Sequence, residues 1–520
     1  MVIMTERPKI LMMILVGLVL VVISLCAFAN SMTKEISRDE HMYCTAGVMM
    51  MQGKKIYTDF SYIAQMPYHP LFYAALYKII SSNQYLLIAR LSSVACDIII
   101  MVALVGISRR ILGTSSALWV LLGLATVLIY VFNPVVDYAN GHAWNNDAVT
   151  MCLILSFWLL TSVNFDHPSN SMYLRIAVIG ALLTLAAFMR TTTAVILVAF
   201  FLAVLFRSGP NKGVKLRTGV SFLLACAFVA IWPAYLIIRA PGAFWLNAFR
   251  IQLLNSRYLR QIGMELGKFD ALSSCIITWE YLPLLIIAAS LWLFTIVKRR
   301  QMFDAGFRSF ILPMILALLL FLVAFTLPAT WAQHLAAPVP FILISLAYPI
   351  AYLRTIRRCR RENYYFVAAT FAVILYAVVT IALNPLVIYR LQVVLNPRTW
   401  MPSQLHKTAG DIADRIPKGS RVLTLAPLYA LEGGCEIYPE LSAGPFVYRV
   451  GNSLTTDELA KIHAVAPKTL SHLVKAHPPD AVIVALEPHD LEESLPEAVL
   501  RPNWRKLVYK DIGLTVYLQS

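Results

Sequence analysis

The chain has 520 residues, of which 59% are hydrophobic, and its mean hydropathy is +0.68. A soluble domain carries about 45–50% apolar residues by a comparable count, so this composition argues against a water-soluble fold. Lysine and arginine total 44 against 28 aspartates and glutamates, which gives a net charge of +16. The basic residues lie in short patches beside apolar segments, without interleaved aromatics, and this indicates membrane topology signals rather than nucleic-acid binding. The eight cysteines form no Cys-x-x-Cys pair, so they indicate neither a zinc site nor a disulfide framework.

Apolar segments long enough to span a membrane recur along the first 400 residues. A spanning helix needs roughly 20 apolar residues, and the sequence predicts about eleven such helices. The first, residues 10–30, is too long for the core of a cleaved signal peptide and is expected to be retained. The fifth and sixth are separated only by Arg190 and Thr191, so they form either a tight hairpin or one broken helix. The spans are expected to begin near Ile10, Leu86, Ser116, Ala148, Ile176, Thr192, Gly219, Tyr281, Phe310, Ala336 and Tyr364.

Four basic clusters set the expected orientation. If the N-terminus is cytoplasmic, alternating spans place all four on the cytoplasmic side, in agreement with the positive-inside rule. Residues 1–400 then form a membrane domain in the cell inner membrane, with long outer loops at 31–85 and 239–280. The clusters are Arg109 and Arg110; Arg207, Lys212, Lys215 and Arg217; Lys298, Arg299, Arg300 and Arg308; and Arg354, Arg357, Arg358, Arg360 and Arg361.

After residue 401 the composition becomes mixed. A helix-like stretch at 404–415 precedes a strand-like run at 421–426, and a second such pair occupies 470–477 and 480–485. Two further strand-like runs, 506–509 and 514–518, close the chain. The predicted fold class is therefore a polytopic α-helical membrane protein of about eleven spans, with a small extracytoplasmic α/β domain at residues 401–520.

Carboxylates on the predicted outer side are candidates for acid–base chemistry. Asp39 and Glu40 follow the first span, where a carboxylate is placed to accept the proton of a hydroxyl group. Asp147 opens the fourth span. A solvated loop explains the first pair equally well, and an N-terminal helix cap explains Asp147. If the first four spans are neighbours, Asp39 and Asp147 face the same outer cavity.

Cations on the same side are candidates for binding an anion. Arg250, Arg257 and Arg260 are spaced so that a helix gathers them within about a 100° stripe. Arginines on the outer face run against the usual charge bias, and they fit either a lipid phosphate or an interfacial helix touching phospholipid headgroups. Inside the second span, Arg90 and Asp97 are interpreted as structural, because an unpaired charge there is costly.

Several short patterns occur together in this chain. They are the Asp39-Glu40 pair, Gly53-x-x-x-Tyr57-x-Asp59-Phe60, Pro67-x-x-Pro70-Leu71 and Asn146-Asp147. In this combination, and in its whole plan, the chain resembles the GT-C glycosyltransferases, which include the protein O-mannosyltransferases and the lipid A aminoarabinose transferase. The resemblance implies an inverting hexosyl- or pentosyltransferase of the cell envelope, with a polyprenyl-phosphate sugar as donor and a glycan, lipid or protein hydroxyl as acceptor.

The resemblance also implies roles for individual residues. Asp39 becomes the general base or the acceptor-binding carboxylate, with Glu40 beside it and Asp147 as the second acidic member. His334 resembles the His or Arg found near this position in the family. Where the aminoarabinose transferases have Lys-Pro-Pro-Leu, this chain has Tyr68-His69-Pro70-Leu71, so a positive charge is missing and His69 replaces it only in part.

The expected reaction needs a base for the attacking hydroxyl and cations for the departing phosphate, which Arg250, Arg257 and Arg260 can supply together with His69 and His334. The metal requirement stays open, because a divalent ion can bind the set Asp39, Glu40, Asp147, His69 and His142. Two alternatives remain. One is a polysaccharide ligase or polymerase that uses a lipid-diphosphate glycan. The other is a secondary transporter, although transporters usually place their binding groups near the bilayer midplane.

Overall fold

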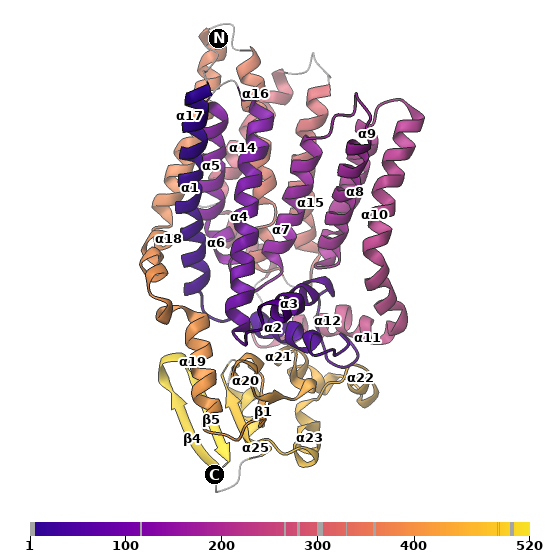
Figure 1. Ribbon diagram of the computed structural model, residues 1–520, viewed down its shortest axis with the longest axis vertical. Helices are drawn as coiled ribbons and strands as arrows, with labels where there is room; N and C mark the ends of the chain where they lie inside the picture. The colour runs from indigo at the N-terminus through magenta and orange to yellow at the C-terminus, as the bar shows by residue number, and fades with distance from the viewer. Residues whose placement is uncertain are drawn as a thin grey trace.

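The computed structural model describes residues 6–114, 117–264, 267–277, 281–298, 305–328, 330–356, 360–485, 487, 489–499 and 504–519. Of the residues named above, Ser116, Arg299, Arg300, Arg357 and Arg358 lie outside the described residues. The molecule is built in three layers (Figure 1). Upright helices form the first, short helices lying across their ends form the second, and a small sheet with its own helices forms the third.

Each predicted span coincides with an upright helix. Among the described residues, six helices are long and apolar enough to cross a membrane, and shorter apolar helices stand beside them. These helices place the chain in a membrane, while the number that cross it stays a prediction. The upright helices are α1 (Glu6–Thr33), α4 (Tyr85–Leu112), α5 (Leu118–Phe132), α7 (Asn146–Thr161), α8 (Asn170–Ala187), α9 (Ala194–Arg207), α10 (Lys212–Arg239), α14 (Leu282–Lys298), α15 (Ala305–Thr326), α16 (Val339–Ile356) and α17 (Arg360–Leu383).

The fifth and sixth predicted spans form a hairpin. Helix α8 ends at Ala187, a 3₁₀ turn covers Thr191–Thr193, and α9 begins at Ala194. The two helices pack against each other and stand side by side in Figure 1. The alternative of one long broken helix is therefore wrong, and the turn with Arg190 reaches the second layer.

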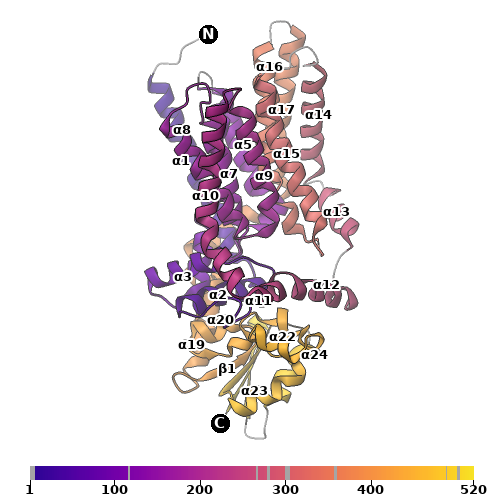
Figure 2. The ribbon, with the colours of Figure 1, turned by 90° about the vertical axis from the view of Figure 1, so that its right-hand side faces the viewer.

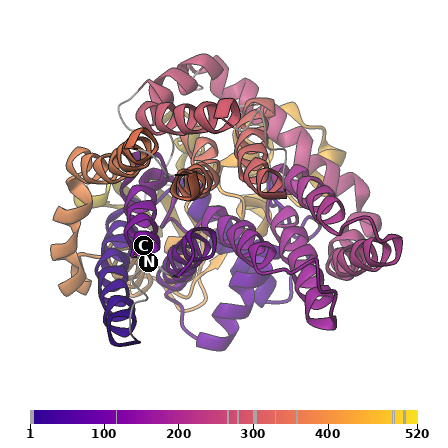
Figure 3. The same ribbon diagram turned by 90° about the horizontal axis from the view of Figure 1, so that it is seen from above.

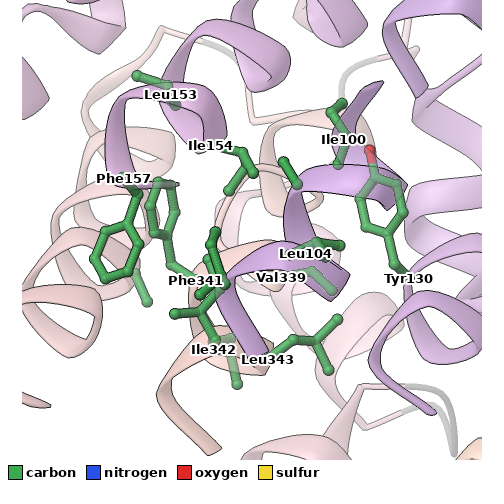
Figure 4. Close-up of a cluster of buried hydrophobic side chains, with 14 of the residues drawn as sticks. Ile100, Leu104, Tyr130, Leu153, Ile154, Phe157, Val339, Phe341, Ile342 and Leu343 are labelled. Carbon is green, nitrogen blue, oxygen red and sulfur yellow. The ribbon is translucent and has the colours of Figure 1, made fainter. Parts of the chain in front are cut away.

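The core of the bundle lies where α4, α5, α7 and α16 meet. Leu104, Ile154 and Phe341 are completely buried there, and Tyr130 and Phe157 are nearly so (Figure 4). Seen from above, the upright helices form an arc rather than a closed ring (Figure 3). Peripheral α10 leaves side chains such as Phe228 exposed, as a helix that faces lipid does.

The second layer consists of the helices formed by the two long loops. The first long loop forms α2 (Arg38–Met51) and α3 (Tyr68–Ile80). The second long loop forms α11 (Pro241–Trp245), a π-helical turn at Leu246–Arg250, α12 (Ile251–Gln261) and α13 (Lys268–Ile276). Helices α2 and α3 approach closely at Gly47, where an added Cβ would lie 2.7 Å from the Cβ of Tyr73. Figure 2 shows α11 and α12 between the bundle and the third layer.

The C-terminal segment, residues 401–519, carries a five-stranded sheet of order β2-β1-β3-β5-β4. Strand β1 (Arg421–Thr424) pairs in parallel with β2 (Glu436–Ile437) and β3 (Ala481–Val484), and β5 (Leu514–Gln519) runs antiparallel to β3 and β4 (Trp504–Tyr509). The predicted helices and strands all form, whereas β2 and most short helices were not predicted. The helices are α19 (Met401–Ala413), α20 (Pro427–Glu432), α21 (Pro445–Tyr448), α22 (Thr456–Lys461), α23 (Leu470–Ala476), α24 (His489–Glu492) and α25 (Ser494–Glu497).

The described basic clusters lie at the end of the bundle away from the sheet. Arg109 and Arg110 end α4, Arg207 ends α9, and Lys212 begins α10. The N-terminus is at this same end, and the C-terminus is at the opposite one (Figure 1). The clusters therefore share one face of the bundle, as predicted.

Candidate active site

A cavity of ≈ 580 Å³ opens where the three layers meet. The start of α2 and the turn between α8 and α9 form part of its wall, together with one face of α12. The C-terminal segment closes another side through Phe446 in α21 and Arg449 just after it. Its charged and titratable lining includes Arg38, Asp39, Arg190, His334 and Arg449, and aromatic lining includes Tyr138, Trp144, Trp331 and Phe446.

Helix α2 begins with a capping box. The Oγ atom of Ser37 accepts a hydrogen bond from the backbone N–H of Glu40 at 3.2 Å, and Oε2 of Glu40 accepts one from the N–H of Ser37 at 3.0 Å. Such a reciprocal pair satisfies two N–H groups that a helix start otherwise leaves free. The capping box holds the side chain of Glu40 in the protein interior, where it is completely buried.

Glu40 and Arg90 form a completely buried ion pair. The guanidinium donates to both carboxylate oxygens, at 2.8 and 2.9 Å, and to the backbone oxygens of Ser31, Lys34 and Glu35. Burial raises the pKa of Glu40, but Arg90 and His142 outweigh burial and hold that pKa well below its usual range. Glu40 is not among the cavity residues. The pair explains Arg90 as the structural residue that was predicted.

Asp39 takes a different direction from its neighbour and lies half-buried in the cavity wall. Burial raises the pKa of Asp39 to about 6, against the opposing charges of Arg449 and Arg190 and with the support of Glu40. Its carboxylate is therefore ionised at neutral pH and is basic enough to accept a proton. The structure places this predicted residue where a bound hydroxyl group can reach it.

Asp147 lies behind the cavity wall rather than in it. It is 1% exposed, and its Oδ2 accepts the backbone N–H of Gly141 at 2.9 Å. The loop that it holds also brings the N–H of Ala143 to Glu40 at 2.7 Å. Asp147 thus supports the loop between α6 (Pro134–Ala139) and α7, and the expectation that it faces the same cavity as Asp39 is not supported.

Arg190 is a cavity residue that the sequence interpretation left without a role. Its Nη2 donates to Oδ1 of Asn145 at 2.7 Å and to Oδ1 of Asn146. Its charge interacts with both predicted carboxylates, Asp39 and Asp147. Within the described part of the chain, its Nε and Nη1 atoms have no hydrogen-bond partner. Those donors are free for an anion in the cavity.

The two predicted histidines differ in position. Nδ1 of His334 accepts the backbone N–H of Trp331 at 3.2 Å, so the neutral ring carries its proton on Nε2 as a donor, and the residue lines the cavity. His69 is 1% exposed and packs on Tyr73 with ring centroids 4.3 Å apart. Burial lowers the pKa of His69 to about 3, aided by Arg190, so His69 has no positive charge to offer a phosphate.

Helix α12 contributes to the cavity through a different face from the predicted one. Gln252, Asn255 and Ser256 line the cavity, whereas Arg250, Arg257 and Arg260 are exposed and absent from its lining. Arg250 pairs with Glu458 of the C-terminal segment at 3.2 Å. The periodicity correctly groups the three arginines, but this geometry does not support their contact with a ligand inside the cavity.

The proposed metal ligands do not converge. Among the described residues, no three His, Cys, Asp or Glu side chains gather as a metal site. Glu40 is held by Arg90, and His142 stacks on Trp144 with ring centroids 4.3 Å apart. The residues present therefore do not fit a resident ion.

An apolar groove lies along α9 and α15. A recess adjoins the cavity and shares Arg190, Thr192 and His334 with its lining. Thr193 and Leu320 also line the recess. The groove has a volume of ≈ 660 Å³ and is lined by apolar side chains of both helices. Arg207, the last residue of α9, also lines it. Several of them, including Val198 and Ile315, are exposed towards the surrounding lipid. The lining is Val195, Val198, Ala199, Leu202, Ala203, Phe206, Arg207, Ile311, Leu312, Ile315 and Leu319.

Replacing Glu40 tests whether its carboxylate has a structural role that Asp39 lacks. Glu40→Gln leaves Arg90 as a buried charge without its anion, and breaking such a pair costs roughly 3–5 kcal/mol of stability. Thermal unfolding of the detergent-purified protein should show a clear fall in Tm for Glu40→Gln. The matched control, Asp39→Asn at the half-buried neighbour, should keep a Tm close to that of the wild type. A Glu40→Gln protein as stable as the wild type would contradict the structural role.

The fold is shared with solved structures. No protein-family model matches the sequence, and a search of curated proteins finds no match. The crystal structure of ArnT from Cupriavidus metallidurans bound to undecaprenyl phosphate aligns with a TM-score of 0.61 and 13% identity, covering 98% of each chain. Its apo state aligns equally well. The oligosaccharyltransferase AglB of Archaeoglobus fulgidus, solved with an inhibitory peptide and a dolichol-phosphate, has a TM-score of 0.49 and 12% identity, over 97% of this chain and 74% of that one. The chain therefore has the fold of ArnT over 98% of its length, and the expected likeness to GT-C glycosyltransferases is confirmed at the level of fold.

Proposed function

We propose that this protein is a membrane glycosyltransferase that moves one sugar from a polyprenyl-phosphate carrier to a hydroxyl group of a glycan, lipid or protein. The observation that carries the proposal is the content of the cavity. A half-buried carboxylate, Asp39, shares the cavity with a cation, Arg190, and the lining of the apolar groove begins at Val195, a few residues after Arg190 in the chain. The reaction needs these three features and needs them adjacent. The ArnT structure, which holds undecaprenyl phosphate on the same fold, supports the carrier class.

The donor fits the cavity by its two chemically distinct parts. Its polyprenyl chain lies in the groove between α9 and α15, where contact with apolar side chains removes it from headgroups and water. Its phosphate lies against Arg190, whose planar guanidinium pairs well with phosphate oxygens. His334 donates a further hydrogen bond through Nε2. The aromatic lining, Trp331 among it, offers apolar faces to the sugar ring.

Transfer is then a single displacement at C1 of the sugar. The acceptor oxygen attacks C1 while its proton passes to the carboxylate of Asp39. The bond between C1 and the phosphate oxygen breaks, and its electron pair stays on the phosphate. Arg190 and His334 stabilise the charge that develops there. Attack opposite the leaving group makes the proposed enzyme inverting.

The exposed arginines of α12 have a separate place in this scheme. Arg257 and Arg260 lie on the surface of the second layer, at the level where the bundle ends, and we assign them to phospholipid headgroups. Binding of the donor phosphate by these arginines, as expected from the sequence, is the competing hypothesis, and the donor-binding experiment below tests it directly.

Asp39→Asn tests the proposed base. A general base contributes roughly 10²–10⁴-fold to a rate, so transfer from a purified lipid-linked sugar should fall by at least a hundredfold. In the wild type, activity should fall as the pH drops through about 6, because protonation of Asp39 removes the base. Asp166→Asn, at an exposed aspartate between α7 and α8, is the control and should transfer normally. Near-normal turnover by Asp39→Asn would exclude the assigned role.

Arg190→Gln tests the phosphate site. A charge-assisted hydrogen bond contributes roughly 1.5–3 kcal/mol, so the KM for lipid-linked donor should rise at least tenfold, with a smaller effect on the KM for acceptor. Arg175→Gln, at the opposite end of α8, is the matched control. If Arg257→Gln and Arg260→Gln raise the donor KM and Arg190→Gln does not, the phosphate binds on the exposed face of α12 instead.

Topology follows from the shared face of the basic clusters. We propose that this face is cytoplasmic, so that the N-terminus is cytoplasmic and the cavity and C-terminal segment face outwards. A reporter enzyme that is active only in the periplasm should work when it is fused after Ser520. A cytoplasmic reporter at the same position should stay silent, and activity there would reverse the orientation.

A further inference from the structure

Arg449 is a buried cation that the C-terminal segment inserts into the cavity wall. It is 9% exposed and lines the same cavity as Asp39. Its guanidinium stacks on Phe446, 5.0 Å from the ring centroid, and on Tyr258 of α12 at 5.9 Å. Its Nη2 atom is buried and has no hydrogen-bond partner within the described residues, and Oε1 of Glu487 lies 3.9 Å from it. A buried charge with so little direct pairing has to be offset by its surroundings.

The position of Arg449 is fixed from both sides of the interface. Nδ2 of Asn255 in α12 donates to the backbone oxygen of Phe446 at 2.6 Å, which ties α12 to the helix that precedes Arg449. Two further bonds hold the segment to the first long loop and to the start of α4. Oγ of Ser61 donates to the backbone oxygen of Ile462 at 2.9 Å, and Oε1 of Glu432 accepts the N–H of Leu86 at 2.8 Å. Arg449 therefore reaches the cavity only when the C-terminal segment is docked against the second layer.

Asp39 and Arg449 line the same cavity, while Glu487 is the carboxylate that interacts most strongly with Arg449 itself. Among the charges acting on Asp39, that of Arg449 has the largest effect, ahead of Glu40, Arg190 and Arg38. The charged and titratable groups that face Asp39 are Arg38, Glu40 and Tyr43 from α2, Tyr62 from the first loop, Tyr138 from α6, Arg190 from the turn before α9, and Arg449. Glu487 in turn pairs with both Arg38 and Arg449.

We propose that Arg449 is a positioning residue for the reaction, which carries a fixed positive charge from the C-terminal segment to Asp39 and keeps its carboxylate ionised. This inference rests on the proposed function, in which Asp39 is the base. It makes the C-terminal segment part of the catalytic unit, because only the docked segment supplies the charge. The negative charge of Glu487, which pairs with Arg449, reduces the effect of Arg449 on Asp39.

The acid limb of the pH–rate profile tests the inference. An adjacent opposite charge lowers a carboxyl pKa by roughly 1–3 units, so Arg449→Gln should move the midpoint of the limb upwards by about one pH unit. Its activity relative to the wild type should then be lowest at acid pH, up to about tenfold reduced, and should recover in alkaline buffer. Arg449→Lys keeps the charge, and its midpoint should lie nearer that of the wild type.

Glu487→Gln gives an independent result of opposite sign. Removing this carboxylate leaves Arg449 and Arg38 to act more fully on Asp39, so the midpoint should move to lower pH. This variant still decides the question if Arg449→Gln fails to fold. Arg421→Gln is the control, since it removes a charge of the same segment that pairs with Glu436 on the surface, and its midpoint should not move.

Two outcomes separate this inference from the proposed function. If Asp39→Asn is inactive while neither Arg449→Gln nor Glu487→Gln shifts the midpoint, the inference is wrong and the base assignment stands. If Asp39→Asn turns over normally, the base assignment itself fails. An Arg449→Gln variant with equal loss at every pH would assign Arg449 to packing alone.

Discussion

The buried ion pair between Arg90 and Glu40 is the interaction on which the site depends. Arg90 belongs to the second predicted span, and its guanidinium binds backbone oxygens at the end of α1 together with both oxygens of Glu40 at the start of α2. Glu40 also accepts the N–H of Ala143 from the loop before α7. One arginine thus joins two upright helices, the first long loop and the loop before α7. A buried pair is a poor source of net stability, but losing one partner is costly, which makes it a strong determinant of arrangement.

Next to this ion pair, the adjacent carboxylates Asp39 and Glu40 have different environments and different proposed roles. The capping box turns Glu40 inwards, where Arg90 keeps it ionised and inert, and the helix geometry turns Asp39 towards the cavity, where burial makes it more basic. The loop held by Glu40 and Asp147 carries Asn145 and Asn146, which in turn hold Arg190. Base and phosphate cation are therefore positioned by one connected set of contacts.

Much of the fold could be predicted from sequence because apolar runs and basic patches are local signals. The helix positions and the helices and strands after residue 401 follow from such signals, and the position of Asp39 just after the first span placed it among the candidates. The pattern Ser37-x-x-Glu40 also announces a capping box, and it could have separated Glu40 from Asp39. Periodicity showed which residues of α12 share a face, but not that Asn255 rather than Arg257 turns to the cavity. Arg190 is a lone charge between apolar runs, and Arg449 reaches the cavity only through docking of a distant segment, which no local pattern encodes.

The central claim is that the cavity that contains Asp39 holds a polyprenyl phosphate with its phosphate against Arg190. An experimental structure of the purified protein with undecaprenyl phosphate tests this most directly. We expect the phosphate against Arg190 and His334, and the lipid chain along the groove between α9 and α15. Phosphate density on the exposed face of Arg250, Arg257 and Arg260, with an empty cavity at Asp39, would contradict the account.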